Sequence, residues 1–216
     1  MKMYTFTKDS VAGYNNRPVP FQLIKQNKQT GSLAVMLPGR GYTVQGPLFH
    51  YSTGVFLNKG FDVLHVNYDY NTVQSGSLTL EEEIQQITED VNSVLDQILK
   101  DQPYGDYTLI GKSLGTIALS SIVNRKGFED AKIVWLTPLL QLDYVMDKML
   151  SSTQIGLCII GDEDPYFIAE KFEKLKDKVN MQTLLIPGTE HSLNYSNRPV
   201  DSIDVLKKVI TEISNF

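Results

Sequence analysis

Residues 109–116 read LIGKSLGT, an apolar run that ends in a serine with a glycine two places to either side. This glycine–x–serine–x–glycine pattern is typical of a nucleophile elbow when a strand precedes it and a helix follows. The sharp turn strains the serine backbone and exposes its oxygen, while the glycines avoid collisions within the turn. The pattern predicts Ser113 as a nucleophile, and an incidental serine in a glycine-rich turn is the competing interpretation.

The rest of the chain supplies the strand and helix context. Short β-rich runs alternate with helical patterns, and the later runs are almost wholly apolar, as expected for parallel strands covered on both faces. We expect helices at 80–98, at 113–125 and from Ser202, the first beginning with a capping box of Thr79 and Glu82. The expected strands are 4–7, 20–26, 32–37, 62–68, 107–111, 132–136, 155–160 and 182–186.

This alternation predicts an α/β fold, with a mostly parallel eight-stranded sheet and helices on both faces. The first two strands have no helix between them, so we expect an antiparallel edge hairpin at the N-terminus. A length of 216 residues, 42% hydrophobic, suits a single domain over residues 1–216. The net charge is −5 and no basic stripe occurs, so nucleic acid is not an expected partner.

The single cysteine and the N-terminus bear on the compartment. Cys158 lies within an apolar run, where a buried core role is expected, and one cysteine forms no intrachain disulfide. The first residues lack the apolar stretch of a signal peptide, and no apolar run approaches the ~20 residues of a membrane span. We therefore predict a cytoplasmic protein without a membrane span. The sequence leaves the oligomeric state open.

A serine hydroxyl is a weak nucleophile unless a base takes its proton, so a histidine is required. The chain has three histidines. His65 lies within an expected strand and His50 within a helical stretch, where structural roles are expected. His191 follows the last expected strand directly, at the carboxyl edge where ligands bind in such sheets. It is the predicted base for Ser113.

A carboxylate should orient the imidazole and stabilise its charged form. The loop 161–165, which follows the penultimate expected strand, reads GDEDP and offers three. Asp164 is our first choice, Asp162 the second and Glu163 the third, while solvation and helix capping are competing roles for such a loop. Asp143, farther along from the strand 132–136, is a further candidate.

Attack on a carbonyl creates an oxyanion that needs hydrogen-bond donors. One expected donor is the backbone N–H of Leu114, directly after the nucleophile. The other is expected from the loop 38–42, which reads PGRGY, with Arg40 as first choice and Gly41 as second. An ordinary glycine turn leading to a helix is the competing interpretation, and a solvated side chain is expected for Arg40.

Four segments together resemble the α/β-hydrolase superfamily: PGRG at 38–41, GKSLG at 111–115, GDED at 161–164 and GTEH at 188–191. The resemblance covers nearly the whole chain. It implies an eight-stranded sheet with an antiparallel second strand, and a triad of Ser113, Asp164 and His191. It also implies an oxyanion hole of Leu114 and Arg40 N–H groups, with no cofactor and no metal.

Two departures from the superfamily stand out. Pro38 occupies a position where many relatives have histidine, and the segment 137–154 has room for only one short helix instead of a large cap. Little or no lid suggests an open pocket for short or surface-presented acyl groups. Candidate lining residues in the strand-end loops are Tyr42, Tyr70, Leu139, Leu140 and Tyr166.

These observations predict a serine hydrolase that cleaves a small-molecule carboxylic ester through an acyl-enzyme. Thioesters use the same machinery, so a thioesterase is the close alternative. Nothing in the sequence indicates recognition of a peptide backbone, and a dehalogenase or epoxide hydrolase would carry a carboxylate at position 113. The rival hypothesis from another class is a non-catalytic binding or scaffold protein, because fold alone does not fix function.

Overall fold

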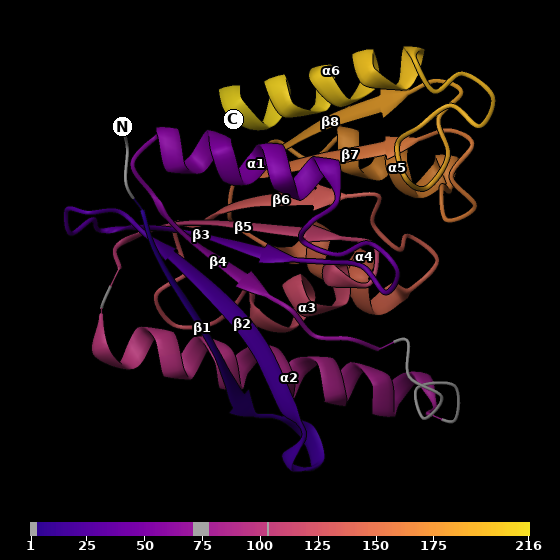
Figure 1. The fold of residues 1–216 in the computed structure, drawn as a ribbon. Coiled ribbons are helices and arrows are strands. Elements are labelled where there is room, and N and C mark those ends of the chain that lie inside the picture. Colours follow the sequence, from indigo (N-terminus) through magenta and orange to yellow (C-terminus); the bar gives the residue numbers. More distant parts are fainter. Residues whose placement is uncertain (1–3, 71–77, 103) are drawn as a thin grey trace.

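The computed structural model describes residues 4–70, 78–102 and 104–216. Its centre is one eight-stranded sheet in the order β1-β2-β4-β3-β5-β6-β7-β8 (Figure 1). β3 to β8 run parallel, whereas β2 pairs antiparallel with both β1 and β4. The strands are β1 (Thr5–Ala12), β2 (Pro18–Lys25), β3 (Ser32–Leu37), β4 (Asp62–Val66), β5 (Asp106–Lys112), β6 (Lys132–Leu136), β7 (Gly156–Gly161) and β8 (Met181–Ile186). This arrangement confirms the predicted fold class.

Helices cover both faces of the sheet (Figure 1). α1 (Pro47–Asn58) and α6 (Asp201–Asn215) pack together on one face, over a core that includes Phe49 and Val209. The opposite face carries α2 (Leu80–Asp101), α3 (Gly115–Ile122), α4 (Asp143–Ser151) and α5 (Ala169–Lys176). Because the central strands are buried from both sides, their side chains are apolar without the alternation of a half-exposed strand.

Most element boundaries agree with the sequence-based expectations to within two residues. The clearest difference is β1, which runs to Ala12 and not to residue 7, because it pairs with β2 from Thr5 to Ala12. This edge strand is largely exposed, so it lacks the apolar pattern from which a strand is predicted. α2 begins at Leu80 with the predicted Thr79–Glu82 capping box.

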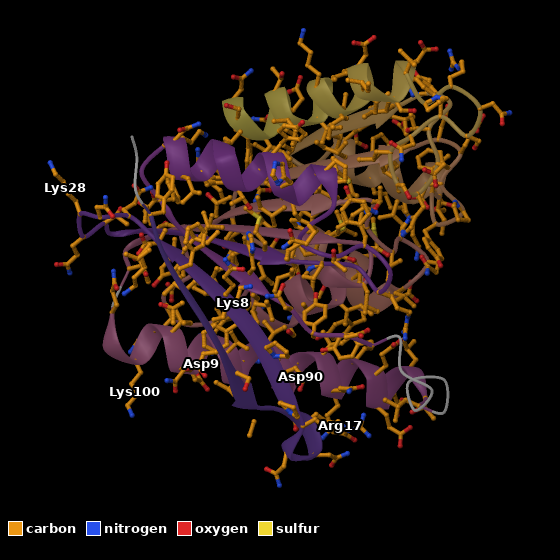
Figure 2. All side chains as sticks on the ribbon, in the orientation of Figure 1. Lys8, Asp9, Arg17, Lys28, Asp90 and Lys100 are labelled. Carbon is orange, nitrogen blue, oxygen red and sulfur yellow. The ribbon has the colours of Figure 1, made fainter. Side chains whose placement is uncertain are left out.

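A buried carboxylate fastens the β1–β2 hairpin to α2. Asp90 accepts hydrogen bonds from the Tyr14 N–H (2.8 Å) and the Tyr70 hydroxyl (2.9 Å). Figure 2 shows Asp90 on α2 and Arg17 near the turn of the hairpin. The hairpin end therefore has a polar anchor in addition to its strand pairing.

Two further predictions concern buried and membrane-spanning segments. Cys158 is fully buried in β7, as expected for a core residue. Within the described ranges, none of the helices combines the length and the apolar character needed to cross a lipid bilayer.

Candidate active site

Ser113 occupies a strained turn between β5 and α3. Its φ of +53° lies in the left-handed region that side chains other than glycine rarely adopt. A Cβ on Gly111 would come within 2.5 Å of the Gly115 carbonyl oxygen, and one on Gly115 within 2.0 Å of the Leu37 carbonyl oxygen. Both flanking glycines are therefore required by close backbone packing. The turn is also fixed by the Ser113 N–H, which donates to the Leu136 carbonyl at 3.0 Å.

Ser113, His191 and Asp164 form a continuous hydrogen-bonded chain. His191 Nε2 lies 2.7 Å from Ser113 Oγ, and His191 Nδ1 lies 2.8 Å from Asp164 Oδ2. The Asp164 side chain is fully buried, whereas that of His191 is 24% exposed. With its proton on Nδ1, the imidazole donates to the carboxylate and leaves Nε2 to accept from the serine hydroxyl. In this arrangement the imidazole is placed to accept the proton of the serine hydroxyl.

The loops after β7 and β8 are packed tightly against each other. A Cβ on Gly161 would lie 2.0 Å from the Thr189 carbonyl oxygen, so only glycine allows this approach. The other oxygen of Asp164 accepts the Tyr166 N–H at 2.9 Å, and the Tyr166 ring meets the His191 ring edge to face. Both the acid and the imidazole are thus fixed by their surroundings.

The other predicted acids lie elsewhere. Asp162 is exposed and accepts the Gly188 N–H at 2.6 Å, which ties together the two loops. Glu163 is also exposed, and Asp143, at the start of α4, pairs with Lys171 at 2.8 Å. Among the hydrogen bonds of the described residues, the imidazole of His191 meets the carboxylate of Asp164 and none of these three.

His50 and His65 do not join the cluster. His65 is buried in β4, where its Nε2 lies 2.8 Å from the Thr53 hydroxyl, and burial lowers its pKa to about 4. His50 lies on the exposed side of α1, against Tyr51. Both positions agree with the structural roles expected from the sequence.

The loop 38–42 lies directly against Ser113. A Cβ on Gly39 would be 3.2 Å from Ser113 Cβ, and the Gly39 N–H donates to the Tyr42 carbonyl at 3.1 Å. The Tyr68 hydroxyl donates to the Pro38 carbonyl at 2.7 Å. The predicted oxyanion donors Leu114, Arg40 and Gly41 all line the cavity at Ser113.

A solvated side chain was expected for Arg40, but the structure shows that it is held by two contacts. It donates to the Tyr70 carbonyl at 3.0 Å and forms an ion pair with Glu83 on α2. Arg40 and Glu83 both line the cavity. The positive charge of Arg40 is therefore compensated by the negative charge of Glu83 at the cavity.

The cavity at Ser113 has a volume of about 550 Å³. Tyr42, Leu139 and Tyr166 line it, as predicted. Tyr70 and Leu140 do not, because the Tyr70 hydroxyl is turned to Asp90 and Leu140 is fully buried in the core. The apolar residues that line it include Leu80, Ile117, Leu139 and Leu142.

Sequence analysis assigned no role to Lys112, which is 1% exposed and lines the cavity. Its Nζ donates to the His191 carbonyl at 2.8 Å and to the Thr137 hydroxyl at 3.1 Å. Burial lowers the pKa of Lys112 to about 8, opposed by the charges of Asp164 and Glu190. A lysine at the end of β5, soon after the apolar residues 109–110, was the available signal.

Comparison with known proteins gives a match over most of the chain. Residues 32–216 match a family model described as an alpha/beta hydrolase domain. A search of curated proteins gave no match.

Solved structures share the fold at low sequence identity. A putative alpha/beta hydrolase of unknown function from Agrobacterium tumefaciens is 17% identical, with a TM-score of 0.74 over 97% of this chain and 94% of its own. An esterase from Pyrococcus furiosus is 14% identical, with a TM-score of 0.73 over 98% and 91%. An α/β serine hydrolase without a lid from Xanthomonas campestris is 15% identical, with a TM-score of 0.67 over 96% and 94%. At these identities the likeness is one of fold.

Proposed function

The chain belongs to the alpha/beta-hydrolase family, and on that premise we propose that it cleaves small carboxylic esters through a covalent acyl-enzyme. One observation carries the proposal. The Ser113 hydroxyl, the His191 imidazole and the buried Asp164 carboxylate are joined by contacts of 2.7 and 2.8 Å. Residues that served only the fold would not require a strained serine backbone beside a base and a buried acid.

In the proposed first half-reaction, Ser113 Oγ bonds to the ester carbonyl carbon as its proton passes to His191 Nε2. The carbonyl electron pair moves to oxygen, and the N–H groups of Leu114 and of Arg40 or Gly41 stabilise this oxyanion. One such donor is typically worth ~10²–10³ in rate. Asp164 stabilises the imidazolium. Collapse of the intermediate expels the alcohol oxygen, which takes the proton back from His191.

The second half-reaction repeats these steps with water. His191 removes a proton from water as the water oxygen attacks the acyl carbon. The tetrahedral intermediate then breaks its bond to Ser113 Oγ, which recovers a proton from the imidazolium. The free acid leaves, and the resting state is restored.

The cavity supports a small, mainly apolar acyl group. Its apolar lining residues, Leu80, Ile117, Leu139 and Leu142, are suited to a hydrocarbon chain, and its volume lies within the range of ligand sites, roughly 300–1,000 Å³. α4, nine residues long, is the only helix between β6 and β7 in the described residues. We therefore propose short to medium acyl chains as the substrate class.

A fluorophosphonate probe tests the proposal directly, because it phosphonylates an activated serine. We expect one adduct on the wild type by intact mass, none on Ser113→Ala, and a strongly slowed reaction on His191→Ala. Ser192→Ala is the matched control, since Ser192 lines the same cavity, and it should label like the wild type.

The substrate class follows from a second assay. Matched esters and thioesters of increasing acyl length, compared by kcat/KM, separate the esterase from the thioesterase hypothesis. A folded wild type that takes up no probe and turns over none of these substrates would contradict the proposal and favour a binding protein.

A further inference from the structure

A buried lysine joins the strand that carries the nucleophile to the loop that carries the proposed base. Lys112 is the last residue of β5, and its neighbour Ser113 is the nucleophile of the proposed function. Its Nζ donates to the main-chain carbonyl of His191 at 2.8 Å. The side chain thus spans from the end of β5 to the loop that follows β8.

The surroundings of Nζ are those of a charged ammonium group. An ammonium has three donors. Two reach the His191 carbonyl and the Thr137 hydroxyl, and the Tyr42 ring centroid lies 4.8 Å from Nζ, within range of a cation–π contact. The charged groups acting on it are Asp164 and Glu190, both favourable to the protonated form.

Burying an ammonium opposes folding, so packing alone does not explain a lysine here. A methionine would fill the same volume without the desolvation cost. What a methionine lacks is a donor for the His191 carbonyl. The hydrogen bond to that carbonyl is therefore the feature that distinguishes lysine at this position.

We propose that Lys112 is a positioning residue for the hydrolase reaction: its ammonium holds the His191 carbonyl and thereby sets the imidazole against Ser113 Oγ. The inference rests on the proposed function, since it assigns His191 as the base. His191 is otherwise placed by side-chain contacts at its ring, to Asp164, Ser113 and Tyr166. Lys112 is the contact that restrains its main chain from the β5 side.

A consequence is a high-pH limit on activity. Hydrogen bonds from a charged donor are roughly twice as strong as neutral ones. Loss of the Lys112 proton therefore loosens the His191 loop. With its pKa lowered to about 8 by burial, the group is protonated at neutral pH and becomes neutral as the pH rises through that value. We expect kcat to fall above about pH 8 on this account.

Lys112→Met tests the positioning role. A misplacement of ~1 Å costs on the order of 10² in rate, so we expect kcat to fall by ~10–100-fold with KM nearly unchanged. The residual activity should no longer decline near pH 8. Lys132→Met is the control, because Lys132 is the first residue of the neighbouring strand β6 and lies at the amino-terminal end of the strands, away from the site. This variant should keep the wild-type rate and pH profile.

Thr137→Val keeps the lysine and removes one of its acceptors. The charged form then loses a partner, so the decline in kcat should move to lower pH. This variant tests the inference even if Lys112→Met fails to fold, which circular dichroism would show. NMR titration of ¹³C-labelled lysine Cε groups follows the ionisation without any substrate.

Two results separate failure of this inference from failure of the proposed function. A wild type that neither takes up the probe nor turns over the esters and thioesters would reject the proposed function. Normal phosphonylation of the wild type, with Lys112→Met equally fast and showing the same pH profile, would reject the role of Lys112 and leave the hydrolase proposal intact. An unchanged profile in Thr137→Val would also count against the inference.

Discussion

Ser113 Oγ and His191 Nε2 lie 2.7 Å apart although 78 residues separate them in the sequence. The parallel sheet brings them together, because every strand from β3 to β8 ends at the same edge. Ser113 follows β5 and His191 follows β8, while Asp164 follows β7, which lies between them. The hydrogen-bonded chain therefore depends on strand order as much as on the residues themselves.

Asp164→Asn should lower kcat for esters by about 10⁴, the size seen when an amide replaces the acid of a Ser-His-Asp triad. The amide changes the preferred tautomer of His191, so Nε2 no longer accepts the serine proton. Asp162→Asn is the matched control because Asp162 contacts Gly188 and not the imidazole. An equal loss in both variants would contradict the assignment of Asp164.

Gly115→Ala should destabilise the fold by several kcal/mol or prevent folding. The new Cβ would meet the Leu37 backbone oxygen at 2.0 Å, and backbone of a central strand cannot move aside cheaply. Urea unfolding measures the effect.

Gly54→Ala is the control for Gly115→Ala, because the same substitution is made where the structure has room for the new methyl group. Gly54 lies in α1 with open space around it, so alanine should stabilise the protein by ~0.5–1 kcal/mol. Equal effects at positions 54 and 115 would show that the elbow is not closely packed.

His65 should make stability depend on pH. Burial lowers its folded pKa to about 4, whereas an unfolded histidine titrates near 6.5, so the unfolded chain binds the proton first as pH falls. The contribution of His65 to the free energy of unfolding is present above about pH 6.5 and is lost as the pH falls toward 4. Between pH 7 and 5 this amounts to about 2 kcal/mol. Urea unfolding of the wild type and of His65→Gln at both pH values measures this difference. An equal change in the free energy of unfolding between pH 7 and pH 5 in both proteins would contradict the prediction.

Cys158 should be inert while the protein is folded. The thiol is fully buried, and burial raises its pKa, so little reactive thiolate exists at neutral pH. Iodoacetamide should leave activity and mass unchanged under native conditions and add one group in urea. Rapid native labelling would show that β7 opens to solvent.

The sequence was sufficient to predict the sheet and the residues that meet at its edge. Three local patterns indicate residues at the carboxyl edge of a parallel sheet. They are the glycines of the elbow, a histidine after the last strand and an acidic loop after the strand before it. The first strand was predicted too short because an exposed edge strand needs no apolar pattern.

Three properties of the site lay outside those patterns because they depend on contacts between distant segments. Arg40 was expected to be solvated, yet Glu83 on α2 pairs with it. Tyr70 was expected in the pocket, yet its hydroxyl turns to Asp90. Lys112 bonds to a main-chain carbonyl, and a carbonyl is present at every residue, so no sequence pattern marks that partner.

The order of the three residues along the chain has a consequence during synthesis. A ribosome makes Ser113 first and His191 last, and β8, the strand that delivers His191, is also the final strand of the sheet. A domain generally folds as a unit, so its last strand must be available before the sheet is complete. With His191 as the proposed base, the serine has no proton acceptor until that strand has docked. On the proposed function, a nascent chain that lacks a docked β8 should therefore not react with a serine-directed probe, and reactivity should begin once β8 has joined the sheet.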